Sequence, residues 1–290
     1  MIRDRLRRGL HHRRSSIVFL LPSLTGVLLF YVLPFGVILY YSVQSRAVGG
    51  SFVGLQNYLK LFRNSAFLLA AKNTALQMLI TVPLGVLLPL GLALILERSI
   101  SARSSLRAAF LSPFFVPTAS VVLVWQVLFH QNGTLNALLN LNVDWFHSSF
   151  SQIVTITLCL WKNIGYHTIL LTSALASIPR NYLDMARLDG AGPVRCFFYI
   201  KIRFLAPSIF FVSLMSYMAA VKIFREVYLL TGAYPFDTLY LLQHFMNNTF
   251  RAMDYPKLCS AAILLTAVTG LFITALLRTE QRLGKDLENE

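Results

Sequence analysis

Charged side chains lie within stretches of sequence that are otherwise apolar, among them Lys162, Lys222, Arg225 and Glu226. A charged side chain at the centre of a membrane-spanning helix costs about 2.5–3.5 kcal/mol on insertion scales, so each of these residues needs an explanation. Lys222 and Glu226 are four residues apart, which places them on one face of a helix where they can pair. The leading interpretation is a structural ion pair between helices, and the alternative is that the charges line an aqueous path or a gate.

The two lysines are expected at similar depths. At ~1.5 Å of rise per residue, Lys222 lies about 22 Å along its helix from Pro207. By the same ~1.5 Å rise, Lys162 lies about 18 Å from Phe150 on a segment that runs in the opposite direction. The two side chains could therefore share one level of a bundle.

The sequence lacks the arrangements that catalysis and metal binding require. It contains no G-x-x-x-x-G-K-[ST] motif, so the chain cannot hold ATP phosphates by that route. Its histidines form no H-E-x-x-H pattern, and its cysteines are odd in number with no C-x-x-C spacing. These residues are His11, His12, His130, His147, His167, His244, Cys159, Cys196 and Cys259. We therefore expect a protein that is not an enzyme, with no catalytic residue, no metal site and no cofactor of its own.

The elements that position these side chains must lie in a membrane. Of the 290 residues, 56% are apolar and 13% are charged, with a mean hydropathy of +0.61, whereas an average soluble domain is about 25% charged. The formal net charge is +14. In so apolar a chain, this charge is typical of membrane topology and of contact with anionic headgroups, and nucleic acid is not an expected partner.

Six segments are long and apolar enough to cross the membrane, which takes about 20 residues for roughly 30 Å of hydrocarbon. They are residues 17–41, 67–96, 109–130, 150–177, 207–231 and 258–277. Several contain proline, which a bundle tolerates when neighbouring helices satisfy the freed backbone groups. The alternating pattern of a membrane β-barrel is missing. The predicted fold is all-α, a polytopic bundle of six transmembrane helices.

Lys and Arg residues are concentrated on one predicted side of the membrane. They cluster in the amino-terminal tail, in the loops after the second and fourth spans, and in the carboxy-terminal tail. The positive-inside rule then places both termini in the cytoplasm. The predicted organisation is a cytoplasmic basic tail at 1–16, a transmembrane domain at 17–279 that includes a cytoplasmic loop at 178–206, and a cytoplasmic tail at 280–290.

The cytoplasmic loop 178–206 has the pattern of two short helices. Asn181 is expected to cap the first helix, Gly190 and Gly192 permit a turn, and Pro193 suits the first position of the second helix. The product would be a helix–turn–helix with small and apolar residues exposed to the cytosol, which favours a docking site. The alternative is a pair of amphipathic helices lying on the lipid headgroups.

The segment D-M-A-R-L-D-G in this loop resembles the EAA loop in the permease subunits of binding-protein-dependent ABC importers. The family pattern is Glu-Ala-Ala, three residues, then Gly, and Asp184-Met185-Ala186 with Gly190 correspond to it here. Further segments that resemble carbohydrate and glycerol-phosphate permeases follow in the same order along the chain. They are residues 52–58, Ser112-Pro113 with Pro117, Trp161-Lys162 with Gly165-Tyr166, residues 177–179, and Lys222-x-Phe224 with Glu226 and residues 230–232.

The resemblance implies a set of partners in the inner membrane of a bacterium or archaeon. These are a second related permease chain, two ATPase subunits that bind ATP and Mg, an external solute-binding protein and the membrane lipid. ATP-driven closure of the ATPases would move the loop and reorient the helices between inward-facing and outward-facing states. The residues implied to couple this chain to the ATPases are Asp184, Met185, Ala186, Asp189 and Gly190.

The resemblance implies a carbohydrate as the solute, with glycerol phosphate or another small polyol ester as the alternative. Sugar sites combine aromatic faces with amides and charges, which selects the candidate pathway or gate residues. They are Gln77, Gln126, Lys162, Asn163, Tyr166, Tyr217, Lys222, Arg225 and Glu226. A function of a different class, ion-coupled secondary transport, would need acidic residues within the membrane, and Glu226 is the only one within a predicted span.

Overall fold

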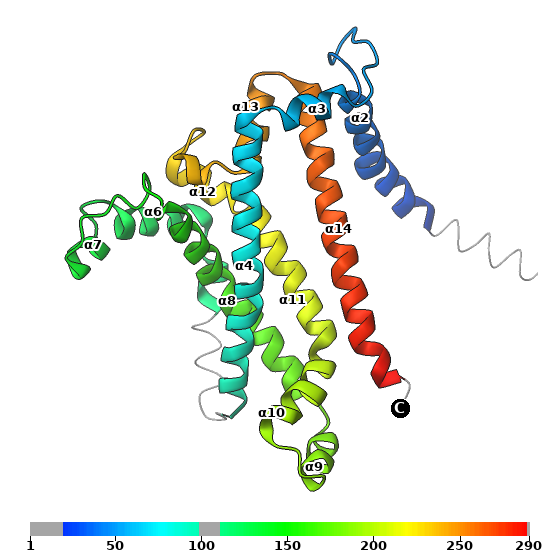
Figure 1. The fold of residues 1–290 in the computed structure, drawn as a ribbon, viewed down its shortest axis with the longest axis vertical. Coiled ribbons are helices and arrows are strands. Elements are labelled where there is room, and N and C mark those ends of the chain that lie inside the picture. The colour runs from blue at the N-terminus through cyan, green and yellow to red at the C-terminus, as the bar shows by residue number, and fades with distance from the viewer. Residues whose placement is uncertain (1–19, 99–110, 289–290) are drawn as a thin grey trace, which may run out of the picture. The chain divides into compact units, whose positions relative to one another are not determined.

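The computed structural model describes residues 20–98 and 111–288, which are predominantly helical (Figure 1). In chain order the helices are η1 (Leu28–Val32), α2 (Leu33–Ser42), α3 (Gln56–Phe62), α4 (Ser65–Arg98), α6 (Thr118–Phe129), α7 (Thr134–Leu139), α8 (Ser151–Ala176), α9 (Arg180–Leu188), α10 (Pro193–Cys196), η2 (Phe197–Lys201), α11 (Ile202–Lys222), α12 (Phe224–Thr231), η3 (Asp237–Leu239), α13 (Leu242–Arg251) and α14 (Tyr255–Glu288). Segments η1 and η2 are π-helical, and η3 is a 3-10 helix. The predicted basic tail at 1–16 and most of the loop after the second predicted span lie outside the described residues.

Four helices within the described ranges are long and apolar enough to cross a membrane. They are Leu20–Ser42, Ser65–Glu97, Pro193–Thr231 and Tyr255–Arg282. These helices contain most of the first, second, fifth and sixth predicted spans. The prediction of an all-helical membrane fold is therefore confirmed at this level.

The third and fourth predicted spans differ from these four for separate reasons. Segment 109–130 is interrupted at Val116 and Pro117, and the helix that follows, α6, has 12 residues. Proline has no N–H to donate and disfavours the α conformation in the residue before it, so the helix breaks there. Segment 150–177 forms one helix of 26 residues, α8, which is long enough but more polar because it carries Lys162, Asn163 and His167.

The described chain forms two compact units. One comprises the residues up to Arg63 together with Thr249–Ala267, and the other comprises Asn64–Asn248 together with Val268–Glu290. In the first unit, Asn57 Nδ2 donates hydrogen bonds to the carbonyl oxygens of Ser42 and Gln44 at 2.9 and 2.8 Å. These bonds hold the end of α2 against α3. The charged residues and the loop described below belong to the second unit.

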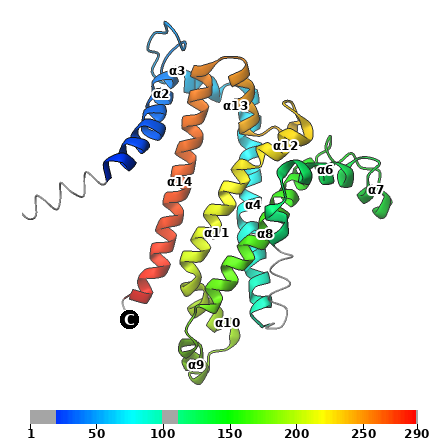
Figure 2. The same cartoon turned by 180° about the vertical axis from the view of Figure 1, so that it is seen from behind.

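Helix α8 lies beside α4 and α11 in the second unit, as both views show (Figure 1, Figure 2). One apolar cluster joins these three helices: Leu90, Ala93, Leu171, Leu175, Ile178, Leu205 and Val212. A second cluster joins α8 to α6 and α12: Val121, Trp125, Val154, Leu158, Cys159, Ile223, Val227, Leu239 and Leu241. Because neighbouring helices cover much of α8, its polar side chains find protein partners instead of lipid.

A proline within α4 leaves a backbone carbonyl that a neighbouring helix satisfies. Pro89 has no N–H, so the carbonyl group of Gly85, four residues earlier, loses its usual helical donor. His167 of α8 is 1% exposed, and its Nδ1 lies 2.9 Å from that carbonyl oxygen. The imidazole therefore donates from Nδ1 to Gly85. A Cβ atom at Gly85 would overlap the Ser216 hydroxyl of α11, so glycine also permits the close approach of these two helices.

Candidate functional site

The charged residues of the apolar segments come together where α6, α8 and α12 meet. Lys162 Nζ of α8 lies 2.7 Å from Glu226 Oε1 of α12 and 3.2 Å from Thr118 Oγ1 of α6. The Lys162 and Glu226 side chains are 19% and 9% exposed. A charge-assisted hydrogen bond of this length between two shielded groups is among the stronger polar contacts in a protein. The pair therefore ties three segments of the chain together.

The predicted pairing of Glu226 with Lys222 is wrong. Helix α11 ends at Lys222 and α12 begins at Phe224, so the regular helix on which the four-residue spacing depends is interrupted at Ile223. The Glu226 carboxylate instead accepts a hydrogen bond from Lys162, 64 residues earlier in the chain. The pair joins α8 to α12, so the partner predicted for Glu226 is corrected from Lys222 to Lys162.

Five of the predicted pathway residues line one pocket of about 350 Å³. They are Lys162, Asn163, Lys222, Arg225 and Glu226, and the other lining residues are Thr118, Cys159, Ala219, Ile223, Phe224 and Gln243. Lys162 and Lys222 thus lie at the same level of the bundle, as their spacing along the helices indicates. The lining carries three basic groups and one carboxylate.

Lys222 and Arg225 differ from Lys162 in their surroundings. Both are exposed, and neither has an ion-pair partner within the described ranges. Lys162 is shielded and already bound by Glu226. The positive charge that faces the open part of the pocket therefore comes from Lys222 and Arg225.

Two predicted pathway residues with amide side chains lie outside this pocket. Gln77 of α4 is 1% exposed, and it donates to Thr81 Oγ1 and accepts from Thr155 Oγ1, each at 3.3 Å. Its amide therefore joins α4 to α8. Gln126 is half-buried on α6.

Two predicted pathway residues with aromatic side chains also lie outside the pocket. Tyr217 is 2% exposed, its ring stacks on Phe272 with centroids 4.4 Å apart, and its hydroxyl lies 2.7 Å from Thr269 Oγ1. It therefore joins α11 to the part of α14 that belongs to the same unit. Tyr166 stacks on Phe114 with ring centroids 5.0 Å apart.

The first helix of the loop at 178–206 ends in a glycine cap. Gly190 has φ +77°, its N–H donates to the carbonyl of Arg187 at 3.0 Å, and the N–H of Ala191 donates to the carbonyl of Ala186 at 2.9 Å. These two bonds form a Schellman motif, whose left-handed position strongly favours glycine. Gly190 is therefore required by the backbone of the turn.

The two ends of the predicted helix–turn–helix differ from expectation. The predicted cap at Asn181 is wrong, because α9 begins at Arg180 directly after Pro179, whose extended backbone starts the helix one residue earlier. The second helix begins at Pro193, as predicted, but it is continuous with the fifth predicted span. Helix α10 passes through the π-helical segment η2 into α11 without a loop. The loop proper is therefore α9 and the turn that follows it.

The predicted coupling residues are accessible on this loop. Asp184, Met185, Asp189 and Gly190 are exposed and Ala186 is half-buried. Asp184 pairs with Arg187 at 3.2 Å, and both side chains face solvent. Beyond them, Leu188 is 88% exposed and Val194 is 69% exposed. Exposed apolar side chains at such a turn are typical of a surface that another protein covers.

Segment η2, which leads into α11, is anchored to the end of α4. Lys201 Nζ lies 2.8 and 2.6 Å from the two carboxylate oxygens of Glu97. Beside this ion pair is a groove of about 970 Å³, lined by residues of α4, α9, α10 and η2 and of the connecting turn. The ion pair ties the carboxyl end of α4 to η2.

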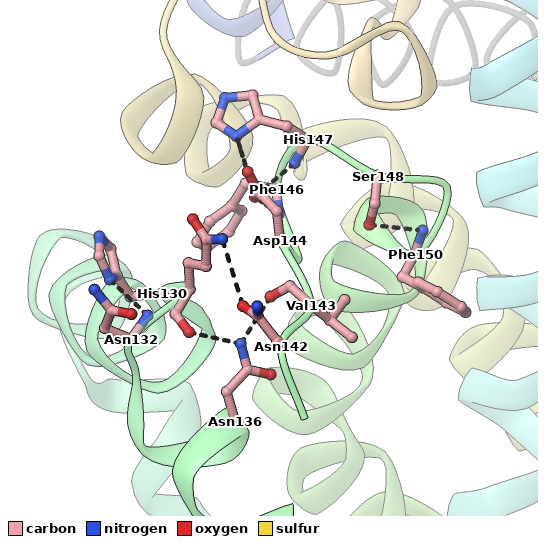
Figure 3. A network of polar contacts seen from close by, with 11 residues as sticks. His130, Asn132, Asn136, Asn142, Val143, Asp144, Phe146, His147, Ser148 and Phe150 are labelled. Atoms are coloured by element: carbon pink, nitrogen blue, oxygen red, sulfur yellow. Dashed lines mark hydrogen bonds and ion pairs between the residues drawn. The ribbon is translucent and has the colours of Figure 1, made fainter. Parts of the chain in front are cut away.

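The connection between α6 and α8 is organised around Asn136 (Figure 3). Its Nδ2 donates to the carbonyl oxygens of Gln131 and Val143 at 2.7 and 2.8 Å, and its Oδ1 accepts from Trp145 Nε1 at 2.8 Å. Nearby, slight desolvation acts to raise the pKa of Asp144, but hydrogen bonds from His147 outweigh it and lower that pKa. The network gives this connection a defined shape.

Several residues of these sites were missed by sequence reasoning. Thr118 and Gln243 line the pocket, and His167 donates a hydrogen bond to the Gly85 carbonyl. His244 of α13 is 0% exposed and packs on the Phe224 ring with centroids 4.7 Å apart, and burial lowers its pKa to about 4. A proline four residues after Gly85 indicates a carbonyl without a donor, but nothing local indicates which helix supplies one.

In the part of the chain that the structure describes, no group of three or more His, Cys, Asp or Glu could hold a metal ion.

The chain is similar to known transport proteins over most of its length. A family model described as binding-protein-dependent transport system inner membrane component matches residues 82–287. The sulfoquinovosyl glycerol transport system permease protein SmoG of Agrobacterium fabrum (strain C58) is 29% identical, over 92% of this chain and 90% of that protein. The sn-glycerol-3-phosphate transport system permease protein UgpA of Pectobacterium atrosepticum is 28% identical, over 88% and 90%.

A solved structure shares the fold. A bacterial alginate ABC transporter, in complex with an alginate pentasaccharide-bound periplasmic protein, contains a chain that superposes with a TM-score of 0.81 at 19% identity, over 97% of this chain and 99% of that one. The family model covers well over half of the sequence, including α8, the charged pocket and the loop at 178–206. The chain is a transport component and not an enzyme, and it belongs to the family of binding-protein-dependent transport system inner membrane components.

Proposed function

We propose that this chain is the permease subunit of an ATP-driven importer in the inner membrane of a bacterium or archaeon. With a second permease chain it forms the path for a solute that an external solute-binding protein delivers. Two partner ATPase subunits bind ATP and Mg, and this chain binds no cofactor. Family membership supports this assignment.

The proposed topology has six spans. The four long apolar helices supply four of them. Helix α8, whose 26 residues give ~39 Å at 1.5 Å per residue, is the fourth span, and the interrupted segment that contains α6 is the third. Both termini and the loop at 178–206 lie in the cytoplasm.

The observation that carries the proposed mechanism is the helical run from Pro193 to Thr231, which is interrupted only by a one-residue turn at Ile223. It begins at the turn after α9 and reaches Arg225, which lines the charged pocket. Since no loop interrupts this run before Lys222, which lines the pocket, a displacement of α9 by the ATPases would move that part of the pocket lining as part of a rigid body. The Lys201–Glu97 ion pair would carry the same displacement to α4. Asp184, Met185, Ala186, Asp189 and Gly190 are the proposed contacts with the ATPases.

The proposed solute is a carbohydrate, with glycerol phosphate or another small polyol ester as the alternative. The two named relatives are permeases for sulfoquinovosyl glycerol and for sn-glycerol-3-phosphate. The pocket of about 350 Å³ offers the amides of Asn163 and Gln243 and the ring of Phe224, which are groups that recognise hydroxyls and sugar faces. Ion-coupled transport gains no support, because the one acidic residue of the pocket is already bound to Lys162.

Substituting Gly190 tests the coupling role. Gly190→Leu places a Cβ at φ +77°, where it costs about 1–2 kcal/mol, and adds bulk to the exposed turn. We expect ATP-driven uptake by the assembled transporter in membrane vesicles to fall to background, while the amount of inserted chain stays unchanged.

Gly192→Leu is the matched control for this experiment. Gly192 is also exposed and a Cβ there meets nothing within 4 Å, but its φ is −70°, so leucine leaves the turn intact. We expect it to retain more uptake than Gly190→Leu. Unchanged uptake by the Gly190→Leu transporter would contradict the proposed coupling.

A further inference from the structure

We propose that Lys222 and Arg225 bind an acidic group of the solute, so that the transported molecule is a small polyhydroxylated acid and not a neutral sugar. This inference rests on the proposed function, because it names the substrate class for the same site. The acidic group is a phosphate ester, a sulfonate or a carboxylate, all of which present oxygens that share one negative charge or more.

The first argument is the charge of the pocket. Of the three basic residues that line it, Lys162 is neutralised by Glu226 at 2.7 Å. Lys222 and Arg225 have no carboxylate partner within the described ranges and are both exposed. Cations at this depth of a membrane protein are costly unless they serve a pathway or meet an opposite charge. An anionic solute supplies that charge.

The second argument is the placement of the two cations. They flank the interruption between α11 and α12, with Lys222 as the last residue of one helix and Arg225 near the start of the next. Guanidinium presents a planar fork that binds two oxygens of a phosphate, sulfonate or carboxylate, and an ammonium group adds a point charge. Together they can hold one acidic group from two sides.

The third argument is the chemistry of the remaining lining. Asn163 Nδ2 donates to the Cys159 carbonyl at 2.8 Å, which orients the amide and leaves its oxygen as an acceptor. Gln243 adds a second amide, and Thr118 a hydroxyl. These groups match the hydroxyls of a polyol. At about 350 Å³ the pocket is near the lower end of the range for small-molecule sites, which limits the bound part of the solute to a small sugar or polyol.

The Lys162–Glu226 pair has a different role in this proposal. It is shielded and joins α8 to α12 beside the pocket, so it positions the wall that carries Arg225 and does not bind the acid. A test of anion recognition therefore changes Lys222 and Arg225 and leaves this pair intact.

The test measures binding of defined probes to the purified transporter with its partner chains but without the external binding protein. The acidic probes are sn-glycerol 3-phosphate and D-glucuronate, and their neutral counterparts are glycerol and D-glucose. We expect saturable binding of at least one acidic probe and no competition by its neutral counterpart. Lys222→Met and Arg225→Gln should each weaken that binding by about tenfold or more, and added salt should weaken it further.

Two further variants keep the result interpretable. Lys72→Met removes a lysine of α4 that does not line the pocket, and it should leave probe binding unchanged. Arg225→Lys keeps the charge but loses the fork, so it should retain more binding than Arg225→Gln while preserving assembly.

Several outcomes would overturn the inference. They are failure of both acidic probes to bind the wild-type transporter, equal binding of neutral probes, or unchanged acid binding in both pocket variants. If the pocket variants lose the second permease chain while acid binding persists, the two cations form a subunit interface instead. If the Lys222→Met and Arg225→Gln transporters still import a neutral solute with ATP, the importer assignment stands and only the acidic substrate class fails.

Discussion

At the scale of single residues, the Lys162–Glu226 pair shows how a charge can be retained within an apolar bundle. Each partner alone would be a poorly solvated charge, but together they form a 2.7 Å contact with Thr118 as an additional acceptor. Removing one partner of a buried pair is much more costly than replacing both, since it leaves the other charge without compensation. Lys222 is exposed and has no such ion pair within the described ranges.

This difference gives a double-substitution test. Glu226→Gln should destabilise the solubilised transporter by up to about 3–5 kcal/mol, because the Lys162 charge remains without its partner. Lys162→Met combined with Glu226→Gln should recover a large part of that loss. The stability of both variants is measured by thermal unfolding, monitored through the intrinsic fluorescence of the complex. The Lys222→Met variant is the control. Equal stability of the Glu226→Gln variant and the double variant would contradict the expected recovery.

At the scale of elements, the helices of the second unit are joined by polar contacts, one of which repairs a proline interruption. Pro89 allows α4 to continue but leaves the Gly85 carbonyl without a helical donor, and His167 of α8 supplies the hydrogen bond at 2.9 Å. The imidazole must carry a proton on Nδ1 to donate this bond. A packing contact between two spans thereby depends on the protonation of one ring nitrogen.

The repair can be tested by restoring the missing donor. His167→Phe should cost about 1–3 kcal/mol, the usual penalty for a buried carbonyl left without a donor. In a Pro89→Ala background, the backbone N–H of the new alanine can donate to the Gly85 carbonyl along the helix, so the same His167→Phe substitution should cost less. Thermal unfolding of the four proteins in this cycle measures the difference. If the His167→Phe substitution lowers the stability equally in both backgrounds, the imidazole does not donate a hydrogen bond to that carbonyl.

At the scale of the whole molecule, the proposed six-span topology places the loop at 178–206 and the connection between α6 and α8 on opposite sides of the membrane. Two exposed leucines report on these positions: Leu188, which is 88% exposed, and Leu138, which is 77% exposed. The three native cysteines, Cys159, Cys196 and Cys259, are buried and give little background reaction.

Labelling with a membrane-impermeant maleimide tests this topology. Leu138→Cys should react in right-side-out vesicles, whereas Leu188→Cys should react only in inverted vesicles stripped of ATPase subunits. Unsubstituted protein measures the background. Reaction of Leu188→Cys from the exterior would place the loop outside the cell and would exclude its coupling role.

The sequence by itself determined the class of protein and its main elements. Apolar length, the distribution of Lys and Arg and the glycine turn at Gly190 are local properties, so they can be read without knowing which helices are neighbours. The same applies to the D-M-A-R-L-D-G segment, whose resemblance to the EAA loop agrees with the family match over residues 82–287.

Only the tertiary structure decided the partners. Glu226 binds a lysine 64 residues away, and Gly85 accepts from a histidine 82 residues away. The four-residue spacing predicted Lys222 as the ion-pair partner of Glu226. The helix is interrupted at Ile223 and α8 packs against α12, so Glu226 pairs with Lys162 instead. Such pairs depend on which helices pack together and at what level, and those are properties of the whole bundle that no local pattern contains.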